Sequence, residues 1–276
     1  MQLNLSSKAK SIIIHSLLGI TAIIMIFPMF WMLLLSLKQY PDKTHNILEL
    51  LTNNYTLSNY YNVLLSDDFI LYFINSIFVA TCITIANVFF CSMTGYVLAR
   101  KEFFGKKVVV ASVLALLIIP AYVVMIPLYK IMLSLGWINS YAALIIPWLV
   151  SPLGVFMLQQ YITSLPHQIE DAARIDGAGE WYVFFKIVMP LCKPILIVLA
   201  IYIFISNWNS FLFPYIFTNS AEFRTLPVGL TFYLGKQSID WGHLMTGASI
   251  SALPMLVIFM FFQKRIISGL TVGALK

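Results

Sequence analysis

The feature that most limits the fold of this chain is a set of long stretches that hold no charged residue. Six such stretches occur, over residues 11–37, 69–99, 108–129, 131–169, 195–221 and 241–263. A helix that crosses a bilayer needs about 20 mostly apolar residues, and each stretch is long enough. Only 10% of the whole chain is charged, against about a quarter in soluble domains. The sequence therefore predicts an integral membrane protein.

These stretches predict an all-α, polytopic membrane protein whose six transmembrane helices form a single domain, residues 1–276. We expect the helices at 12–37, 70–97, 108–129, 141–162, 194–216 and 244–263. The fourth helix begins near Tyr141, because the segment "SLGWINS" just before it is a polar break that contains glycine. The first apolar run is too long for the core of a signal peptide, and no small-residue cleavage site follows it. We interpret it as a retained helix.

The loops between the predicted helices differ in their basic content, and this difference predicts the orientation. Segments 1–11, 98–107, 163–193 and 264–276 together hold 12 Lys and Arg, whereas the loops on the other side hold 5. Cytoplasmic loops carry the excess of basic residues, so both termini are predicted to be cytoplasmic in a multi-pass protein of the cell (inner) membrane. The net charge of +6 follows from this bias and does not indicate a nucleic-acid partner. The surrounding partner is membrane lipid.

The cytoplasmic loop 163–193 is the most charged part of the chain and is expected to hold two short helices. The first begins near Pro166, whose missing N–H costs nothing in a first turn. It ends at Gly177, which we expect to take the positive φ of a helix C-cap. Ile169, Ala172, Ala173 and Asp176 recur at the helical spacing and share a face of small side chains. In the second piece, the same spacing predicts one large apolar face formed by Trp181, Phe184, Phe185 and Val188.

The spacing of residues in this loop resembles the loop motif of ABC importer permeases. That motif reads Glu-Ala-Ala, three residues, Gly, nine residues, Ile, one residue, Leu-Pro. Here Asp171-Ala172-Ala173, Gly177, Ile187 and Met189-Pro190 keep every interval. Asp171 in place of Glu and Met189 in place of Leu retain the chemical character. The string "EDAARIDGA" is similar to the carbohydrate-uptake branch, the relatives of the smaller maltose-transporter permease. Further similar strings are "NSIFVA", "TGYVLAR", "NWNSFLFP", "RTLPVGL" and "GLTVGALK".

The resemblance implies a permease subunit of an ATP-driven, binding-protein-dependent importer for a sugar, an oligosaccharide or a sugar-like solute. Its implied partners are a second homologous permease, two cytoplasmic ABC ATPase subunits and an extracytoplasmic solute-binding protein. In that family the loop inserts into a cleft of the ATPase. The residues that would make this contact are Glu170, Asp171, Ala172, Ala173, Asp176, Gly177 and Ala178.

Other functions are less well supported by the residues. The phosphate-binding motif G-x-x-x-x-G-K-[ST] is absent, so ATP hydrolysis is assigned to a separate chain and the protein is not expected to be an enzyme. No His/Cys spacing is typical of a metal site, and we expect no metal, no cofactor and no catalytic residue. A secondary transporter or channel that works without ATPases remains an alternative, although such carriers usually keep ionisable residues at membrane depth. A permease for a non-sugar solute such as glycerol phosphate is the other alternative.

Several polar side chains lie within the predicted transmembrane helices, among them Asn75, Ser76, Asn87 and Gln159. Polar residues in helix bundles commonly bond to neighbouring helices, and this is the interpretation we favour for most of them. Asn207, Trp208 and Asn209 on the fifth helix combine amides with an aromatic face. Because hydroxyl-rich ligands need such groups, these three residues are the candidates for the substrate pathway.

Overall fold

The computed structural model describes residues 7–44, 46–52, 54–65, 68–235 and 238–272. Across these residues the regular structure is helical, with a single β-bridge between Lys38 and Tyr55 and no strand. The predicted all-α class is confirmed. The chain divides into two compact units, Met1–Ile70 with Leu230–Leu253 and Leu71–Gly229 with Pro254–Lys276.

The first unit contains α1 (Ser7–Ser36), α2 (Ile47–Leu51), α3 (Ser58–Leu65) and the start of α15 (Trp241–Val272). The apolar side chains along most of α1 are exposed, as expected of a helix that faces lipid. After α1 the chain folds back through Asn59, whose Nδ2 donates to the carbonyls of Ser36 and Lys38 at 2.9 Å each. Lys38 is buried, and its Nζ donates to Thr52 O at 2.5 Å and lies 4.2 Å from the Tyr55 ring centroid.

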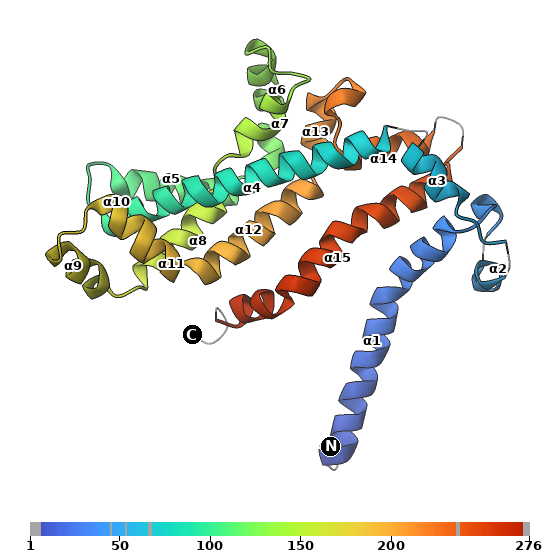
Figure 1. The fold of residues 1–276 in the computed structure, drawn as a ribbon, viewed down its shortest axis with the longest axis horizontal. Coiled ribbons are helices and arrows are strands. Elements are labelled where there is room, and N and C mark those ends of the chain that lie inside the picture. Colours follow the sequence, from blue (N-terminus) through green and yellow to red (C-terminus); the bar gives the residue numbers. More distant parts are fainter. Residues whose placement is uncertain (1–6, 45, 53, 66–67, 236–237, 273–276) are drawn as a thin grey trace. The chain divides into compact units, whose positions relative to one another are not determined.

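The second unit is built around α4 (Phe69–Arg100), α8 (Pro152–Thr163) and α12 (Lys193–Trp208). Its core includes Ile83, Leu158 and Leu199, each at most 1% exposed. Gly95 of α4 is packed closely against α8, because a β-carbon there would lie 2.9 Å from Leu158 Cβ and 3.0 Å from Gln159 N. Figure 1 shows α4 as one uninterrupted helix, with α9 and α10 near one of its ends.

Four described helices are long and apolar enough to cross a membrane, and two bent helix pairs could each add one more span. The four segments are Ser11–Ser36, Phe69–Arg100, Tyr141–Thr163 and Trp241–Gln263. All coincide with predicted spans, and α4 agrees with its prediction to within three residues at either end. The chain is thus a polytopic helical protein with four to six candidate spans.

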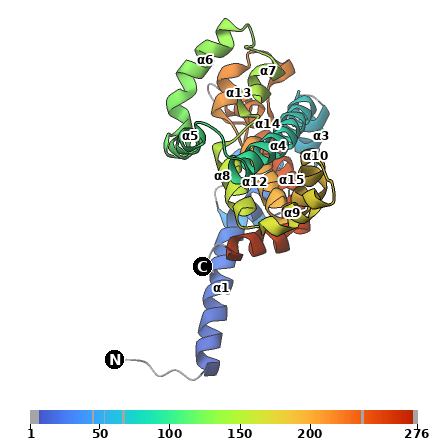
Figure 2. The ribbon, with the colours of Figure 1, turned by 90° about the vertical axis from the view of Figure 1, so that its left-hand side faces the viewer.

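The predicted span 108–129 is not one straight helix. α5 (Lys106–Ile118) is followed by a 3-10 turn (Ala121–Val124) and by α6 (Met125–Ser134), and the two halves meet at 99°. The break lies at Pro120, which cannot donate a backbone hydrogen bond and forces the preceding residue out of the helical region. Ile119 accordingly has φ −72° and ψ 120°. Figure 2 shows α6 turning away from α5.

The predicted span 194–216 is also interrupted, between α12 and α13 (Leu212–Phe217). The amide side chains of Asn207 and Asn209 turn back and donate to the carbonyls of Ile203 and Ile205, at 2.8 and 3.0 Å. Such local bonds compete with helix continuation. Pro214 would further remove an internal hydrogen bond from a continuous helix, but near the start of α13 it is tolerated.

The predicted span 141–162 consists of α7 (Tyr141–Ile145), a 3-10 turn (Ile146–Trp148) and α8. Ser151 caps α8 by accepting from Gly154 N at 3.0 Å, and Pro152 occupies the first helical position, a usual start for a helix. The remaining short helices are α9 (His167–Ile175), α10 (Glu180–Tyr182), α11 (Met189–Leu191) and α14 (Leu226–Leu230).

Candidate functional site

The predicted loop 163–193 begins with the short helix α9, which ends as the sequence predicts. Gly177 has φ +86°, so the expected left-handed C-cap is confirmed. Gly177 N donates to Arg174 O at 3.0 Å, and Ala178 N donates to Ala173 O at 2.9 Å. This pair of bonds defines a Schellman motif, which satisfies the last carbonyls of α9 and redirects the chain toward α10.

The predicted ATPase-contact residues differ in where they lie on this loop. Four of them, Asp171, Ala172, Asp176 and Gly177, are exposed, Ala173 and Ala178 are half-buried, and Glu170 is buried. Ala173 and Ala178 pack against the hydrophobic core of the second unit. These four exposed residues have short side chains, and the apolar Ile175 among them is also exposed, at 86%. Glu170, in contrast, is covered by its own chain.

Glu170 binds to the end of α4 through Arg100. The Arg100 Nε lies 2.6 Å from Glu170 Oε1, and the two side chains are only 2% and 3% exposed. The other two guanidinium nitrogens also contact the start of α9: Nη2 donates to Leu165 O at 2.9 Å, and Nη1 lies 3.1 Å from His167 Nε2. Because a guanidinium only donates, His167 Nε2 accepts this bond. Arg100 thus uses all three nitrogens on the segment 165–170.

A second acidic residue, Glu180 at the start of α10, extends this arrangement toward solvent. Its carboxylate lies 2.8 Å from Lys101 Nζ and 3.3 Å from both Arg174 Nε and Tyr96 Oη. The hydrogen bond from Lys101, with a further contribution from Arg174, holds the pKa of the Glu180 carboxyl below its usual range although partial burial opposes this. Tyr96 Oη and Arg174 Nη2 also lie 3.3 Å from Glu170 Oε2. Tyr96, Arg100 and Lys101 therefore attach the α4 end to both short helices.

The second piece of the loop does not present the predicted apolar face. Val183, Phe184 and Val188 are buried, whereas Trp181 is 64% and Phe185 is 44% exposed. The reason is that Val183–Val188 form a π-helix. Its i→i+5 bonding brings Val183 and Val188 to the same side. The prediction that Trp181, Phe184, Phe185 and Val188 share one face is therefore wrong. Instead the Trp181 and Phe185 rings stack on each other, 5.8 Å apart.

The three candidate pathway residues are not brought to one place. Trp208 is 3% exposed and packs against Phe73 and Phe204, with ring centroids 5.5 and 6.0 Å away. Asn209 is exposed at the end of α12. Asn207 lines a pocket inside the second unit. Successive helical residues point about 100° apart, so this divergence follows from their positions on the last turn of α12.

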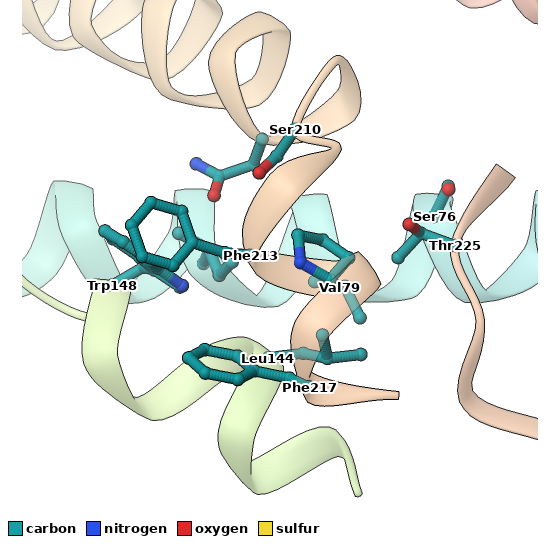
Figure 3. Close-up of a pocket in the computed structure, with 11 residues that line it drawn as sticks. Ser76, Val79, Leu144, Trp148, Ser210, Phe213, Phe217 and Thr225 are labelled. Carbon is teal, nitrogen blue, oxygen red and sulfur yellow. The ribbon is translucent and has the colours of Figure 1, made fainter. Parts of the chain in front are cut away.

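The pocket beside Asn207 has a mixed lining. It is formed by Ser76, Val79, Ile83, Leu144, Trp148, Asn207, Ser210, Phe213, Pro214, Phe217 and Thr225. Figure 3 shows the Trp148 and Phe213 side chains close together below Ser210, and their rings meet edge to face at 4.6 Å. Amide, hydroxyl and aromatic groups are those that a sugar needs. However, the volume that the centre of a water molecule can occupy inside it is only about 10 Å³, which is about the room for one water molecule.

The prediction of interhelical hydrogen bonding for the other polar residues is confirmed at three positions of α4. Asn75 Nδ2 donates to the carbonyls of Glu222 and Arg224, Ser76 Oγ accepts from Leu226 N, and Asn87 Nδ2 donates to Trp148 O. The sequence reasoning did not identify Tyr96, Arg100 and Lys101 as partners of the loop. One signal was available. All three residues lie at the end of a predicted span, where polar side chains can bond to the adjacent loop.

Comparison with known proteins agrees with this geometry. The profile of the family described as "Binding-protein-dependent transport system inner membrane component" matches residues 91–272. The chain is 38% identical to an arabinooligosaccharides transport system permease of Bacillus subtilis, over 92% of each chain. It is 37% identical to a trehalose/maltose transport system permease of Thermococcus litoralis, over 92% of this chain and 93% of the relative.

A solved structure shows the same fold. The chain superimposes with a TM-score of 0.85 on a chain from the crystal structure of a bacterial ABC transporter involved in the import of the acidic polysaccharide alginate. The match covers 96% of this chain and 99% of that chain at 22% identity. The chain therefore belongs to the family of binding-protein-dependent transport system inner membrane components, and it is a membrane transport subunit.

Proposed function

We propose that this chain forms half of the translocation pathway of an ATP-driven importer for a sugar or oligosaccharide. Its partners are a second, homologous permease, two cytoplasmic ABC ATPase subunits and an extracytoplasmic solute-binding protein. The sugar assignment draws on the relatives, which are named as permeases for arabinooligosaccharides and for trehalose and maltose. ATP is hydrolysed on the separate ATPase chains, because the sequence has no phosphate-binding loop.

In this proposal residues 1–276 act as one transmembrane domain of the cell membrane, with six spans and both termini in the cytoplasm. The Lys and Arg bias of 12 to 5 between the two sets of loops supports this orientation. The bent pair α5 and α6 would provide the fifth span, and α12, the second half of the other bent pair, would provide the sixth. Loop 163–193 then faces the cytoplasm, on the side where ATP is available.

The observation that carries the proposal is the exposed surface at the end of α9. Asp171, Ala172, Asp176 and Gly177 contribute short side chains to this surface, beside the exposed apolar side chain of Ile175. A β-carbon added at Gly177 would have no other residue within 4 Å apart from its neighbours in sequence. A partner surface can therefore approach the backbone closely at Gly177. The helix that presents this surface is fixed from behind by the buried Glu170–Arg100 pair, as a docking element must be in order to transmit force.

The test is to enlarge this surface without disturbing the fold. Gly177→Val and Gly177→Ala share the cost of a positive φ, about 1–2 kcal/mol, but only Val adds bulk beyond the β-carbon. If the ATPase docks here, Val should weaken pull-down of the ATPase by the tagged permease far more than Ala does. Gly179→Val is the control, because Gly179 is exposed with φ −73° and open space around it. Equal ATPase binding by all three variants would rule out the docking surface.

Asp171 provides a second test of the docking surface. Its Oδ1 lies 3.0 Å from Arg174 Nη1, yet the side chain is 61% exposed. Asp171→Glu should preserve ATPase binding, because it keeps the charge. Asp171→Lys should abolish binding if a basic group of the partner faces it. Since Lys would also repel Arg174, Asp171→Asn is the matched variant, and it should give an intermediate loss.

Uptake into vesicles identifies the solute. Membranes that contain the assembled importer and its binding protein are supplied with ATP and with labelled arabinotriose, maltose or trehalose. Accumulation of at least one of these that depends on both ATP and the binding protein is expected. Uptake that continues without ATPase subunits would instead favour a carrier or channel.

A further inference from the structure

The end of α4 and the start of α9 are connected by an ion pair, Arg100–Glu170, in which both side chains are buried. Arg100 and Glu170 are 2% and 3% exposed, and they meet at 2.6 Å. Other described ion pairs near the loop have at least one partner that is much more exposed, as in Lys101–Glu180 at 40% and 53%. Surface pairs of that kind hold their geometry weakly, whereas a buried pair that loses one partner leaves an uncompensated charge.

The geometry of Arg100 also makes this connection stiff. Its three guanidinium nitrogens contact Glu170, Leu165 O and His167 Nε2. A planar guanidinium with three partners fixes both the distance and the angle between the two helices. A lysine at this position would keep the charge but would offer only one nitrogen, and it could not reproduce the three contacts.

The same helix forms a wall of the pocket beside Asn207. Ser76, Val79 and Ile83 of α4 line that pocket, and Asn87 of α4 donates to the carbonyl of Trp148, another lining residue, at 2.6 Å. From residue 71 to residue 100, α4 is an uninterrupted α-helix without proline. Movement applied at Arg100 is therefore carried along the helix to the pocket wall.

We propose that Arg100 and Glu170 are positioning residues that couple displacement of α9 to opening of the pocket lined by α4. This inference rests on the proposed function, because it needs an ATPase that displaces α9. It assigns separate tasks to neighbouring residues of one loop. The exposed Asp171 and Gly177 receive the partner, and the buried Glu170 passes the movement to the membrane helix.

The experiment measures pocket opening directly, with N-ethylmaleimide as the probe. Ser210→Cys places a thiol in the pocket, in a background where Cys82, Cys91 and Cys192 are replaced by serine or alanine. The room for about one water molecule in the present structure should keep this thiol unreactive. In vesicles that also hold the second permease and the ATPases, ATP should accelerate its labelling by roughly tenfold, the scale of a typical coupling between sites.

Two variants and one control test the Arg100–Glu170 pair. Glu170→Gln keeps the size of the side chain but removes its charge, and it should abolish the ATP-dependent increase in labelling while the ATPase is still pulled down and still hydrolyses ATP. Arg100→Lys should retain only part of the increase. Glu102→Gln is the control, because Glu102 pairs with Lys106 on the same segment but is 89% exposed. This control should respond to ATP like the unaltered protein.

The outcomes separate the inference from the proposed function. Normal ATP-dependent labelling in Glu170→Gln would overturn the coupling role of the Arg100–Glu170 pair, and the proposed docking surface would be unaffected. If Glu170→Gln fails to insert or to bind the ATPase, the double variant Arg100→Gln, Glu170→Gln decides. Restored ATPase binding without ATP-dependent labelling would support the coupling role of the pair. Persistent loss of binding would assign the pair to folding alone and would overturn the coupling role. Failure of the unaltered permease to bind any ATPase would overturn the proposed function and this inference with it.

Discussion

The two ends of α4 are attached to their neighbours by opposite kinds of chemistry. At the Arg100 end, the helix holds α9 and α10 through ion pairs that involve Glu170 and Glu180. At the Asn75 end, the contacts are neutral. Asn75 Nδ2 donates to Glu222 O and Arg224 O at 2.8 and 2.9 Å, and its Oδ1 accepts from Tyr141 Oη at 2.7 Å.

This difference determines how each junction fails. A neutral amide contributes separate hydrogen bonds, each with a net value of about 1 kcal/mol, so damage to it is limited to the bonds removed. A buried ion pair depends on both partners, and removal of one of them costs about 3–5 kcal/mol because the other charge remains unpaired. The ionic junction should therefore respond sharply to single substitutions, and the amide junction gradually.

Arg100→Ala is the substitution with the largest expected effect. It removes three contacts and leaves the buried Glu170 with only the longer ion pair to Arg174, at 3.3 Å, so the cost should approach the value of about 3–5 kcal/mol for a broken buried pair. Amide hydrogen exchange of the purified permease in detergent should show strongly accelerated exchange over α9 and little change around Leu226. Acceleration of the same size at both ends of α4 would mean that the substitution unfolds the unit as a whole.

Asn75→Ala tests the amide junction and should cost about 1–3 kcal/mol, because it leaves two partly buried carbonyls without their donor. Asn75→Asp should be worse than Ala, since it directs a carboxylate at those carbonyls in a region of low polarity. The measurement is the thermal midpoint in detergent together with exchange over 222–226. The exposed Asn219→Ala serves as the control on the same loop and should change neither quantity. If Asp is tolerated better than Ala, the orientation of the Asn75 amide is not the one described.

Gly177→Ala tests the α9 cap in the isolated permease. An alanine at φ +86° should cost about 1 kcal/mol and should loosen the last turn of α9, without any steric contact. Gly179→Ala, at φ −73°, should cost nothing. Hydrogen exchange at Ala178 and its neighbours distinguishes the two variants, and equal exchange in both would contradict the Schellman cap.

Glu180→Gln should have the smallest effect, because its pairs with Lys101 and Arg174 are largely exposed and such pairs contribute about 0–1 kcal/mol. Its signature is the pH dependence. The folded protein lowers the pKa of this carboxyl from its usual 4.5, so its stabilisation is complete above that pH and is lost as the pH falls through the lowered value. The thermal midpoint of the variant should therefore fall less than that of the unaltered protein as the pH is lowered below 4.5. Identical pH profiles would show that Glu180 does not contribute.

The elements that could be predicted from the sequence are those set by local chemistry. Hydropathy located α1, α4 and the apolar part of α15 because a spanning helix requires a continuous apolar run. Gly177 predicted the end of α9 because its backbone preference acts within one turn. The break at Pro120 was present in the sequence as a proline, but membrane helices often tolerate proline, so the residue alone does not decide between a kink and a break.

What could not be predicted depends on partners far away in the chain. The burial of Glu170 follows from Arg100, which is 70 positions earlier, and an acidic residue in a charged loop otherwise suggests an exposed one. The π-helix at Val183–Val188 changes which side chains face the core, yet nothing in the spacing of Trp181, Phe184 and Phe185 separates i+5 from i+4 periodicity. The separation of Asn207, Trp208 and Asn209, in contrast, follows from the roughly 100° between successive helical residues and could have been predicted.

The close packing at Gly95 has a mechanical consequence for α4. Gly95 is the position where a side chain would overlap with α8, so it is the natural fulcrum if the helix tilts. At a rise of 1.5 Å per residue, Arg100 lies about 7.5 Å from this point and Asn75 about 30 Å on the other side. The arms have a ratio of about four to one. A shift of 1 Å at the ionic junction would thus become a swing of about 4 Å at the amide junction, which distance measurements between spin labels could detect.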